Sequence, residues 1–327
     1  MKNQIRLAIF AVLGSILFFI IKFLNDSLSN NIPLSRIQSE TGSNTNVTTF
    51  AQLSVANERI SLPMLIIPAL NVDLVPIPLY PVLGIQSRES YVSRRRLLES
   101  LGDALSANEI RALYMFLHAA PEQVGLSRSD YNGVGDVLLL KIEDQKILPE
   151  DYSDHLVFMF LDETRDKTWR DYCLQHLGTV YRRMPEEKRP IIKQTYLDAL
   201  EPGSIYAGTA LISMRRSAGE PDLPPAFIVE KAFEVASSGS YDDAERLTGL
   251  HVAAEFNHPE AVKLAREIVS SQHSASFRSA ALAVIGSHGE QSDLALLERY
   301  VKSSDIRIRT AANAAMQKLL AENNKDL

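Results

Sequence analysis

Several common sources of structure and chemistry are missing from this sequence. There is one cysteine in 327 residues, so an internal disulfide and a cysteine-based structural zinc site are both excluded. An excess of basic side chains is also missing. The 34 lysine and arginine residues face 40 acidic ones, and the net charge of −6 argues against a protein that coats nucleic acid.

Recognisable catalytic and nucleotide-binding motifs are missing as well. The sequence contains no phosphate-binding loop, no nucleophile elbow and no paired His-Glu zinc helix. Gly133-Val134-Gly135 lacks a third glycine and does not follow a predicted strand, so we do not interpret it as a dinucleotide loop. Long alternation with a period of two residues is absent too, and we therefore expect no sheet.

What the sequence does contain begins with a membrane signal in residues 1–24. Lys2 and Arg6 precede an apolar run from Leu7 to Leu24, which Lys22 interrupts. As a helix this run would be about 27 Å long, close to a hydrocarbon core of about 30 Å. No Ala-x-Ala cleavage site follows, so we predict an uncleaved signal-anchor that crosses the membrane through residues 7–24.

The same segment sets the expected location of the rest of the chain. Basic residues at the amino end favour a cytoplasmic N-terminus, which leaves the remainder outside the cytoplasm. A cleaved secretory signal is the alternative, and it would give a secreted or periplasmic protein. The sequence leaves open which of the two holds.

Residues 25–87 are predicted to link this anchor to a folded body. The first part, to about residue 60, is rich in Asn, Ser and Thr, and it has too few large apolar side chains to fold. Residues 61–84 are strongly apolar but contain five prolines, which oppose a helix. We predict an extended strap that lies against the body. Insertion of the strap into a partner is the alternative.

Residues 88–327 show helical periodicity throughout, and the predicted fold class is all-α. Apolar residues three and four apart predict the first helices at 93–104, 108–119, 134–145 and 151–161. Ser106, followed three residues later by Glu109, has the spacing of a capping box at the start of the second of these helices.

The strongest signal is an internal repeat. Five copies begin at Trp169, Tyr206, Glu245, Phe277 and Ile308, with spacings of 37, 39, 32 and 31 residues. We number each copy from its first residue. Position 5 is always small: Cys173, Ala210, Gly249, Ala281 and Ala312. Position 6 is leucine in the first four copies and Asn313 in the last. We predict that both positions line a buried seam between helices.

Position 2 is arginine in four copies, and in three of them an aspartate stands four residues earlier. These pairs are Asp166 and Arg170, Asp242 and Arg246, and Asp305 and Arg309. An aspartate at a helix start can accept the free backbone amides there, and an arginine one turn later can reach it. The spacing therefore predicts a capping aspartate that pairs with its arginine.

The Asp-x-x-x-Arg start, the small residue and the following leucine resemble HEAT repeats over residues 166–320. This resemblance implies a right-handed α-solenoid of helical hairpins, whose extended surface would bind a protein along the second helices of successive pairs. It implies a binding or scaffolding role and does not imply a reaction. Repeats of about 30 residues also occur in bilin lyase proteins, so a HEAT-like lyase or cofactor-handling protein is the alternative.

Cysteine and histidine side chains provide the candidate chemistry. Cys173 with His176 could form a nucleophilic pair, but a buried small residue is favoured because Cys173 occupies the small position. His251, Glu255 and His258 could bind a metal, but His258-Pro259 indicates a turn that displaces the third ligand.

The remaining candidates are single residues and one basic run. His118, His155, His273 and His288 are expected singly, at the surface or at caps. Arg94-Arg95-Arg96 could bind an anionic lipid or an acidic partner, although a solvated helix face is favoured.

The sequence thus predicts a membrane-tethered HEAT-repeat scaffold that binds another protein and is not an enzyme. We assign no catalytic, cofactor-binding or metal residues, and we expect no cofactor, no nucleic acid and no small-molecule ligand.

Overall fold

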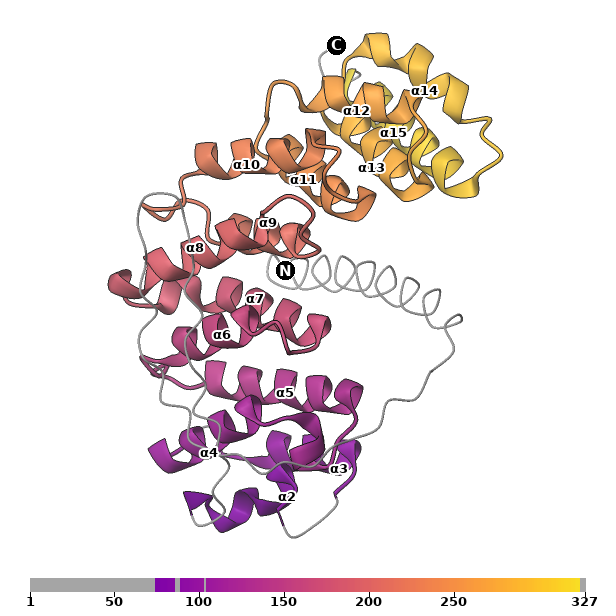
Figure 1. The fold of residues 1–327 in the computed structure, drawn as a ribbon. Helices are drawn as coiled ribbons and strands as arrows, with labels where there is room; N and C mark the ends of the chain where they lie inside the picture. The colour runs from indigo at the N-terminus through magenta and orange to yellow at the C-terminus, as the bar shows by residue number, and fades with distance from the viewer. Residues whose placement is uncertain (1–73, 86–88, 103, 324–327) are drawn as a thin grey trace. The chain divides into compact units, whose positions relative to one another are not determined.

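The computed structural model describes residues 74–85, 89–102 and 104–323 (Figure 1). The predicted anchor at 1–24, residues 25–60 and most of the strap lie outside this part of the chain. The described residues form α-helices and short 3₁₀ turns, with one isolated bridge between Glu220 and Leu223 and no strand, which confirms the all-α prediction. Among these residues, no helix has both the length and the apolar character needed to cross a membrane.

Most helices come in pairs, and we call the odd-numbered ones first helices and the even-numbered ones second helices. The first helices are α3 (Tyr91–Ser100), α5 (Arg128–Glu143), α7 (Lys167–Val180), α9 (Ala207–Arg216), α11 (Asp243–Glu255), α13 (Ala275–His288) and α15 (Ile306–Asn323). The second helices are α2 (Tyr80–Leu83), α4 (Ala107–His118), α6 (Tyr152–Leu161), α8 (Arg189–Ala199), α10 (Pro225–Ser237), α12 (Ala261–Ser270) and α14 (Leu294–Tyr300).

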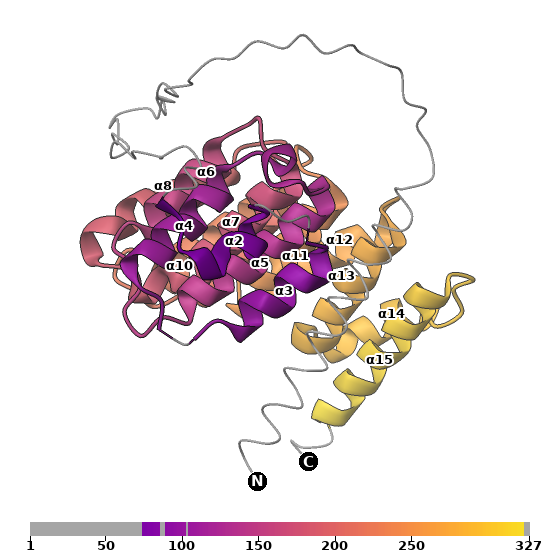
Figure 2. The ribbon, with the colours of Figure 1, turned by 90° about the horizontal axis from the view of Figure 1, so that it is seen from below.

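The two kinds of helix form two layers. Each first helix from α3 to α13 contacts the next first helix, and each second helix packs against the first helix that follows it in the chain. Figure 2 shows the separation for α4, α6, α8 and α10 on one side and α3, α5, α7 and α11 on the other. Stacked helical pairs of this kind are the architecture of an α-solenoid. The right-handed sense stays a prediction.

Helix starts follow from serine and aspartate caps. The side chains of Ser90, Ser106, Ser127, Asp166 and Ser274 each accept a hydrogen bond from a backbone N–H in the first turn of the helix that follows. At Ser106 the carboxylate of Glu109 also accepts from the Ser106 backbone N–H, at 2.7 Å, so the predicted capping box is confirmed.

Two of the expected helix boundaries were wrong. α5 begins at Arg128 and not at 134, because Ser127 caps it and Gly133 and Gly135 continue the helix. α3 runs from Tyr91 to Ser100 and stops before residue 104, since Leu101 takes an extended conformation.

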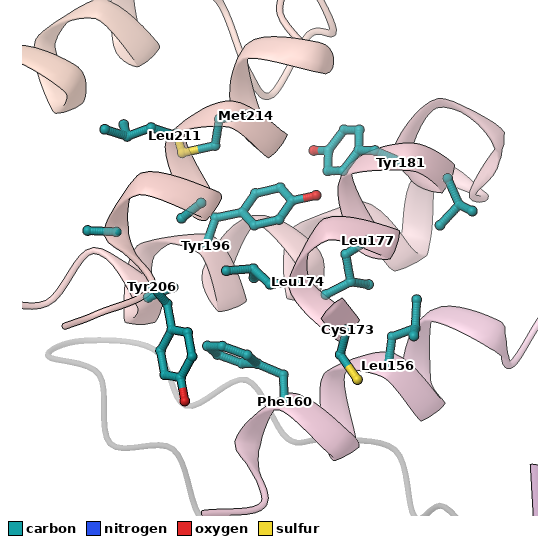
Figure 3. Close-up of a cluster of buried hydrophobic side chains, with 14 of the residues drawn as sticks. Leu156, Phe160, Cys173, Leu174, Leu177, Tyr181, Tyr196, Tyr206, Leu211 and Met214 are labelled. Atoms are coloured by element: carbon teal, nitrogen blue, oxygen red, sulfur yellow. The ribbon is translucent and has the colours of Figure 1, made fainter. Parts of the chain in front are cut away.

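The predicted seam of the repeat is confirmed. All five position-5 residues are buried, and the leucines at position 6 are fully buried, whereas Asn313 is exposed. Figure 3 shows how Cys173 and Leu177 of α7 lie beside Leu156 of α6, within the same apolar cluster as Leu211 of α9. Small side chains at position 5 let neighbouring helices approach closely. At Gly249, for example, an added Cβ would lie 2.6 Å from the Ala232 carbonyl oxygen.

The expected pairing of the position-2 arginine with its aspartate was wrong. Each arginine reaches backward to a carbonyl oxygen at or just after the end of the preceding helix: Arg170 to Phe160, Arg246 to Ala236, Arg278 to Val269 and Arg309 to Ser303. These carbonyls lack helical partners and carry the negative end of the helix dipole, so a cation satisfies them. The aspartates still mark helix starts; Asp166 and Asp305 accept backbone N–H groups of their own first turns.

The same arginines also connect successive copies. Arg170 lies 5.0 Å from the ring centroid of Tyr206, and Arg246 lies 5.0 Å from that of Phe277. Tyr206 and Phe277 are the first residues of the following copies. Each of these two arginines therefore bonds to the second helix that precedes its own first helix. It also lies at cation–π distance from an aromatic ring of the following copy.

The end of the proline-rich strap is helical and not extended. Residues 77–79 form a 3₁₀ turn and continue into α2, with Pro76 just before the turn and Pro81 in the first turn of α2. A proline is tolerated there because first-turn N–H groups have no intrahelical partner. Leu79 and Val82 are fully buried, and α2 packs on α3. The expectation that this part of the strap lies against the body is thus confirmed, in a helical form.

Candidate functional site

Cys173 and His176 do not form a nucleophilic pair. The Cys173 side chain is fully buried, and burial raises the pKa of its thiol, which suppresses the reactive thiolate. The His176 ring is bonded elsewhere: Nδ1 lies 2.7 Å from Glu143 Oε1 and Nε2 lies 3.1 Å from Asp136 Oδ1. Cys173 is therefore a packing residue of the seam.

His176 instead forms the centre of a buried ionic cluster between α5 and α7. Burial lowers the pKa of His176, but the hydrogen bonds to Asp136 and Glu143 and the charges of both carboxylates outweigh burial and raise it to about 9. The ring is consequently charged at neutral pH. The Tyr152 hydroxyl of α6 donates to the same Glu143 oxygen at 3.0 Å. The polar groups of this cluster bond to one another. The cluster therefore links α5, α6 and α7, and we do not interpret it as a ligand site.

The three residues considered as metal ligands, and disfavoured, do not come together. Glu255 pairs with Arg215 at 2.6 Å, while the His258 ring stacks on Phe233 with a centroid distance of 3.9 Å. His251 lies exposed on α11. Within the described part of the chain, no group of three or more histidine, cysteine, aspartate or glutamate residues is arranged to hold a metal ion.

Arg94, Arg95 and Arg96 form the expected solvated face only in part. Arg94 is buried, and its Nε donates to the Glu89 carbonyl oxygen at 3.1 Å. Arg96 is exposed, and the side chain of Arg95 is 43% exposed although it donates to the Tyr91 hydroxyl and pairs with Glu99. Two exposed arginines, one of them already paired, give little affinity for an acidic surface. Gly133 and Gly135 lie within α5 and leave room for the side chains of Tyr91 and Trp169.

A histidine pair that the sequence did not predict lies between α4 and α6. His118 and His155 were expected singly, at the surface or at caps, but His118 Nε2 lies 2.7 Å from His155 Nδ1, and both rings are largely removed from solvent. His155 Nε2 faces Asp151 at 3.5 Å. Burial, then the proximity of His155 and of Arg165, hold the pKa of His118 well below its ordinary range. The two histidines are 37 residues apart, and no local pattern links them.

Two cavities adjoin this pair. One, of about 250 Å³, is lined by His118, Tyr131 and Trp169 among others, and we call it the His118 cavity. The other, of about 670 Å³, is lined by Tyr114, Ile147 and His155 among others. The histidine pair therefore separates two hollows in the N-terminal half of the described chain.

The family match lies in the C-terminal half of the chain. Residues 229–317 match the family of HEAT repeats. Human deoxyhypusine hydroxylase in complex with glycerol is a similar solved structure, at 12% identity, with 72% of this chain and 92% of that chain covered. Its TM-score of 0.31 does not show that the two folds are the same. No curated protein matches this chain. The segment from within α10 to within α15 is thus similar to HEAT repeats.

Proposed function

We propose that this chain is a membrane-tethered, non-catalytic scaffold that binds another protein through the surface of its stacked helical pairs. The likeness of residues 229–317 to HEAT repeats supports a helical-repeat scaffold, because such repeats commonly serve protein interaction. The anchor at 1–24 and an extracytoplasmic location for the helical body belong to this proposal.

The observation that carries the proposal is the unbroken contact of the first helices with one another from α7 to α15. Their position-7 residues are Gln175, Ile212, His251, Ala283 and Ala314, and all except the half-buried Ile212 are exposed. We call these five residues the position-7 row. The second helices make their main contacts with first helices and few with one another. We therefore place the partner along the first helices rather than the second.

The row offers a surface that a partner could approach closely. At its C-terminal end the exposed side chains are only the methyl groups of Ala283 and Ala314. Short side chains on adjoining helices allow a partner's backbone or side chains to lie near the helix axes. Enlarging the side chains of Ala283 and Ala314 therefore tests whether a partner lies on this surface.

The test compares the two layers by photo-cross-linking in membranes of the native host. A photoreactive amino acid at position 251 on α11 should capture a reproducible protein, while one at the exposed Glu298 of α14 should not. Ala283→Arg and Ala314→Arg should abolish that capture, with Glu298→Arg as the matched control. All three changes are at exposed positions and should alter the free energy of unfolding by no more than about 0.5 kcal/mol. Capture from α14 alone, or a solitary chain, would contradict the proposed surface.

The membrane location has its own test. Mass spectrometry of the mature N-terminus should find residues 1–24 retained, and the helical body should be digested by protease added from the extracytoplasmic side. Protection of the body from that protease would overturn the proposed orientation, whatever the outcome of the cross-linking.

A further inference from the structure

The larger of the two cavities is an open groove lined mostly by apolar side chains. Its volume is about 670 Å³, and its walls come from Leu74, from the first two turns of α4 and from the loop that leads into α6, together with His155. Tyr114 adds an aromatic ring to a set of apolar lining residues: Leu74, Ala107, Ile110, Ile147, Leu148 and Pro149. We call this hollow the Ile147 groove.

Two of the lining side chains leave a large apolar surface uncovered. Ile147 is 82% exposed, the highest value among the large apolar side chains of the described residues, and Leu74 is 49% exposed. Exposed apolar surface that gathers in one hollow is typical of a place that another apolar group covers. We therefore expect the groove to hold an apolar occupant.

The sequence directly before Leu74 has the character required of that occupant. Residues 61–73 lie outside the described part of the chain. They contain the aliphatic run Leu65-Ile66-Ile67 and a single charged residue, Asp73. Pro63 and Pro68 carry no backbone N–H, so this stretch brings fewer unpaired donors into an apolar groove than another sequence would.

Leu74 connects this segment to the groove. It is a lining residue of the groove and also the residue that follows position 73. A tethered segment has an effective concentration on the order of millimolar, which favours it over a free partner of equal affinity. On the C-terminal side of Leu74 the strap already packs on the body, where Leu79 and Val82 are fully buried. Docking of residues before Leu74 would extend that contact.

The charges of the groove do not favour a strongly charged partner. The lining includes one arginine, Arg111, and two carboxylates, Glu150 and Asp151. The Asp151 carboxylate already accepts from the Tyr114 hydroxyl at 3.4 Å and lies 3.5 Å from His155 Nε2. Such a mixed set attracts neither a polybasic nor a polyacidic segment, so an uncharged aliphatic segment fits the groove better.

We propose that residues 65–70 lie in the Ile147 groove of their own chain, where their aliphatic side chains cover Ile147 and Leu74. The groove belongs to α4 and to the loop before α6, in the layer of second helices. The inference therefore does not rest on the proposed partner surface along the first helices. Insertion of the strap into another protein would then require its release from the groove.

The first test measures how far the strap protects position 147. In the full-length Ile147→Cys protein, iodoacetamide should modify the introduced thiol alone, because Cys173 is fully buried and burial raises the pKa of its thiol. We call Ile66→Asp/Ile67→Asp the strap variant; an apolar groove excludes its two carboxylates. The strap variant should speed modification at position 147 at least about threefold, which corresponds to a groove covered for two thirds of the time or more.

Two matched controls separate this protection from a general effect of charge. Asn44→Asp/Thr45→Asp adds the same charge outside the strap and should leave the rate at position 147 unchanged. Ile205→Cys places the thiol in the loop before α9, where the isoleucine is 52% exposed, and its rate should not respond to the strap variant. Equal rates at position 147 with and without the strap variant would overturn the proposal.

A second test identifies where the strap lies and to which chain the groove belongs. A photoreactive amino acid at position 67 can reach any surface within about 25 Å of Leu74, so the tether alone does not dictate capture in the groove. In an equal mixture of ¹⁴N and ¹⁵N chains, it should capture residues 107–114 or 147–151 of a chain with the same isotope. Mixed-isotope capture would assign the groove to the strap of a second copy, and capture elsewhere on the body would place the strap on another surface. Either result would contradict the proposal.

Discussion

The N-terminal and C-terminal halves of the described body bury different side chains. Of the twelve buried polar or charged residues, nine precede residue 200: Arg94, Asn132, Glu143, Gln145, Ser153, Asp154, His155, His176 and Thr195. Only Ser213, Ser217 and Asp293 follow it. The first half is therefore fastened by specific polar bonds between particular partners, and the second mainly by repeated apolar contacts.

Position 8 of the repeat shows this difference between the two halves at equivalent positions on successive first helices. Its residues are His176, Ser213, Val252, Val284 and Ala315, and all five are buried. The first two bond to the preceding first helix, since His176 contacts Glu143 and Ser213 Oγ donates to the Leu174 carbonyl oxygen. The last three are apolar. The match to HEAT repeats, over 229–317, lies within the half where this position is apolar.

The largest expected effect comes from making the first half resemble the second. His176→Val leaves the buried Glu143 without its cation, and we expect a loss of about 3–5 kcal/mol in the free energy of unfolding, measured by urea denaturation. The double variant Glu143→Leu/His176→Val removes both charges and should recover most of that loss.

The reverse substitution is the control for this comparison. Val284→His buries an imidazole at the same repeat position, where the native side chain is apolar and 4% exposed, and should also destabilise the protein. If His176→Val were neutral, the ionic cluster would not distinguish the two halves.

The next effect is a dependence of stability on pH. The folded pKa of His176, about 9, is raised above its ordinary value of 6.5. Its contribution is therefore complete below about 6.5 and is lost as the pH rises through 9, by on the order of 3 kcal/mol. Denaturation curves of the wild type should show this fall relative to Glu143→Leu/His176→Val. Parallel pH profiles of the two proteins would refute the assignment.

Close helix contact in the second half gives a smaller effect. A Cβ at Gly286 would lie 2.5 Å from Ala315 Cα, so Gly286→Ala should push α13 and α15 apart and destabilise by about 1–3 kcal/mol. At Gly133 the nearest atoms belong to the end of the Tyr91 side chain, which can move. Gly133→Ala should thus be near neutral in thermal denaturation, and equal effects at both glycines would remove the contrast.

The smallest effect concerns the arginine at position 2. Arg246→Met keeps the apolar stem but loses the hydrogen bond to Ala236 and the contact with the Phe277 ring, and should destabilise by about 1 kcal/mol. Arg216→Met, at an exposed position on α9, is the comparison and should change stability little. Urea denaturation of the two variants measures the difference.

The regular half was predictable from sequence because its signals are local and repeated. The small residue at position 5 and the leucine at position 6 recur at fixed spacing, and their burial follows from helical periodicity. The arginine was recognised as a register mark, but its partner was misassigned. An arginine in the first turn of a helix can bond to the capping residue of its own helix or to the end of the preceding helix, and spacing alone does not decide between them.

The polar features of the first half could not be predicted in the same way. His118 and His155 meet because α4 and α6 pack together, and Glu143 reaches His176 across 33 residues. No periodic pattern encodes such unique long-range pairs. The proline rule failed at Pro78, in the 3₁₀ turn, and at Pro81, because it opposes proline within a helix and permits it in the first turn.

The neighbour-to-neighbour contacts of the helical pairs also bear on how the body opens. Among the described helices, α15 has α13 and α14 for its main neighbours, whereas α7 is held by α5, α6 and α9. Separation can therefore begin at the C-terminal pair and advance inward one pair at a time, without global unfolding. Backbone amides of α14 and α15 would then exchange with solvent deuterium well before those around the interior of α7.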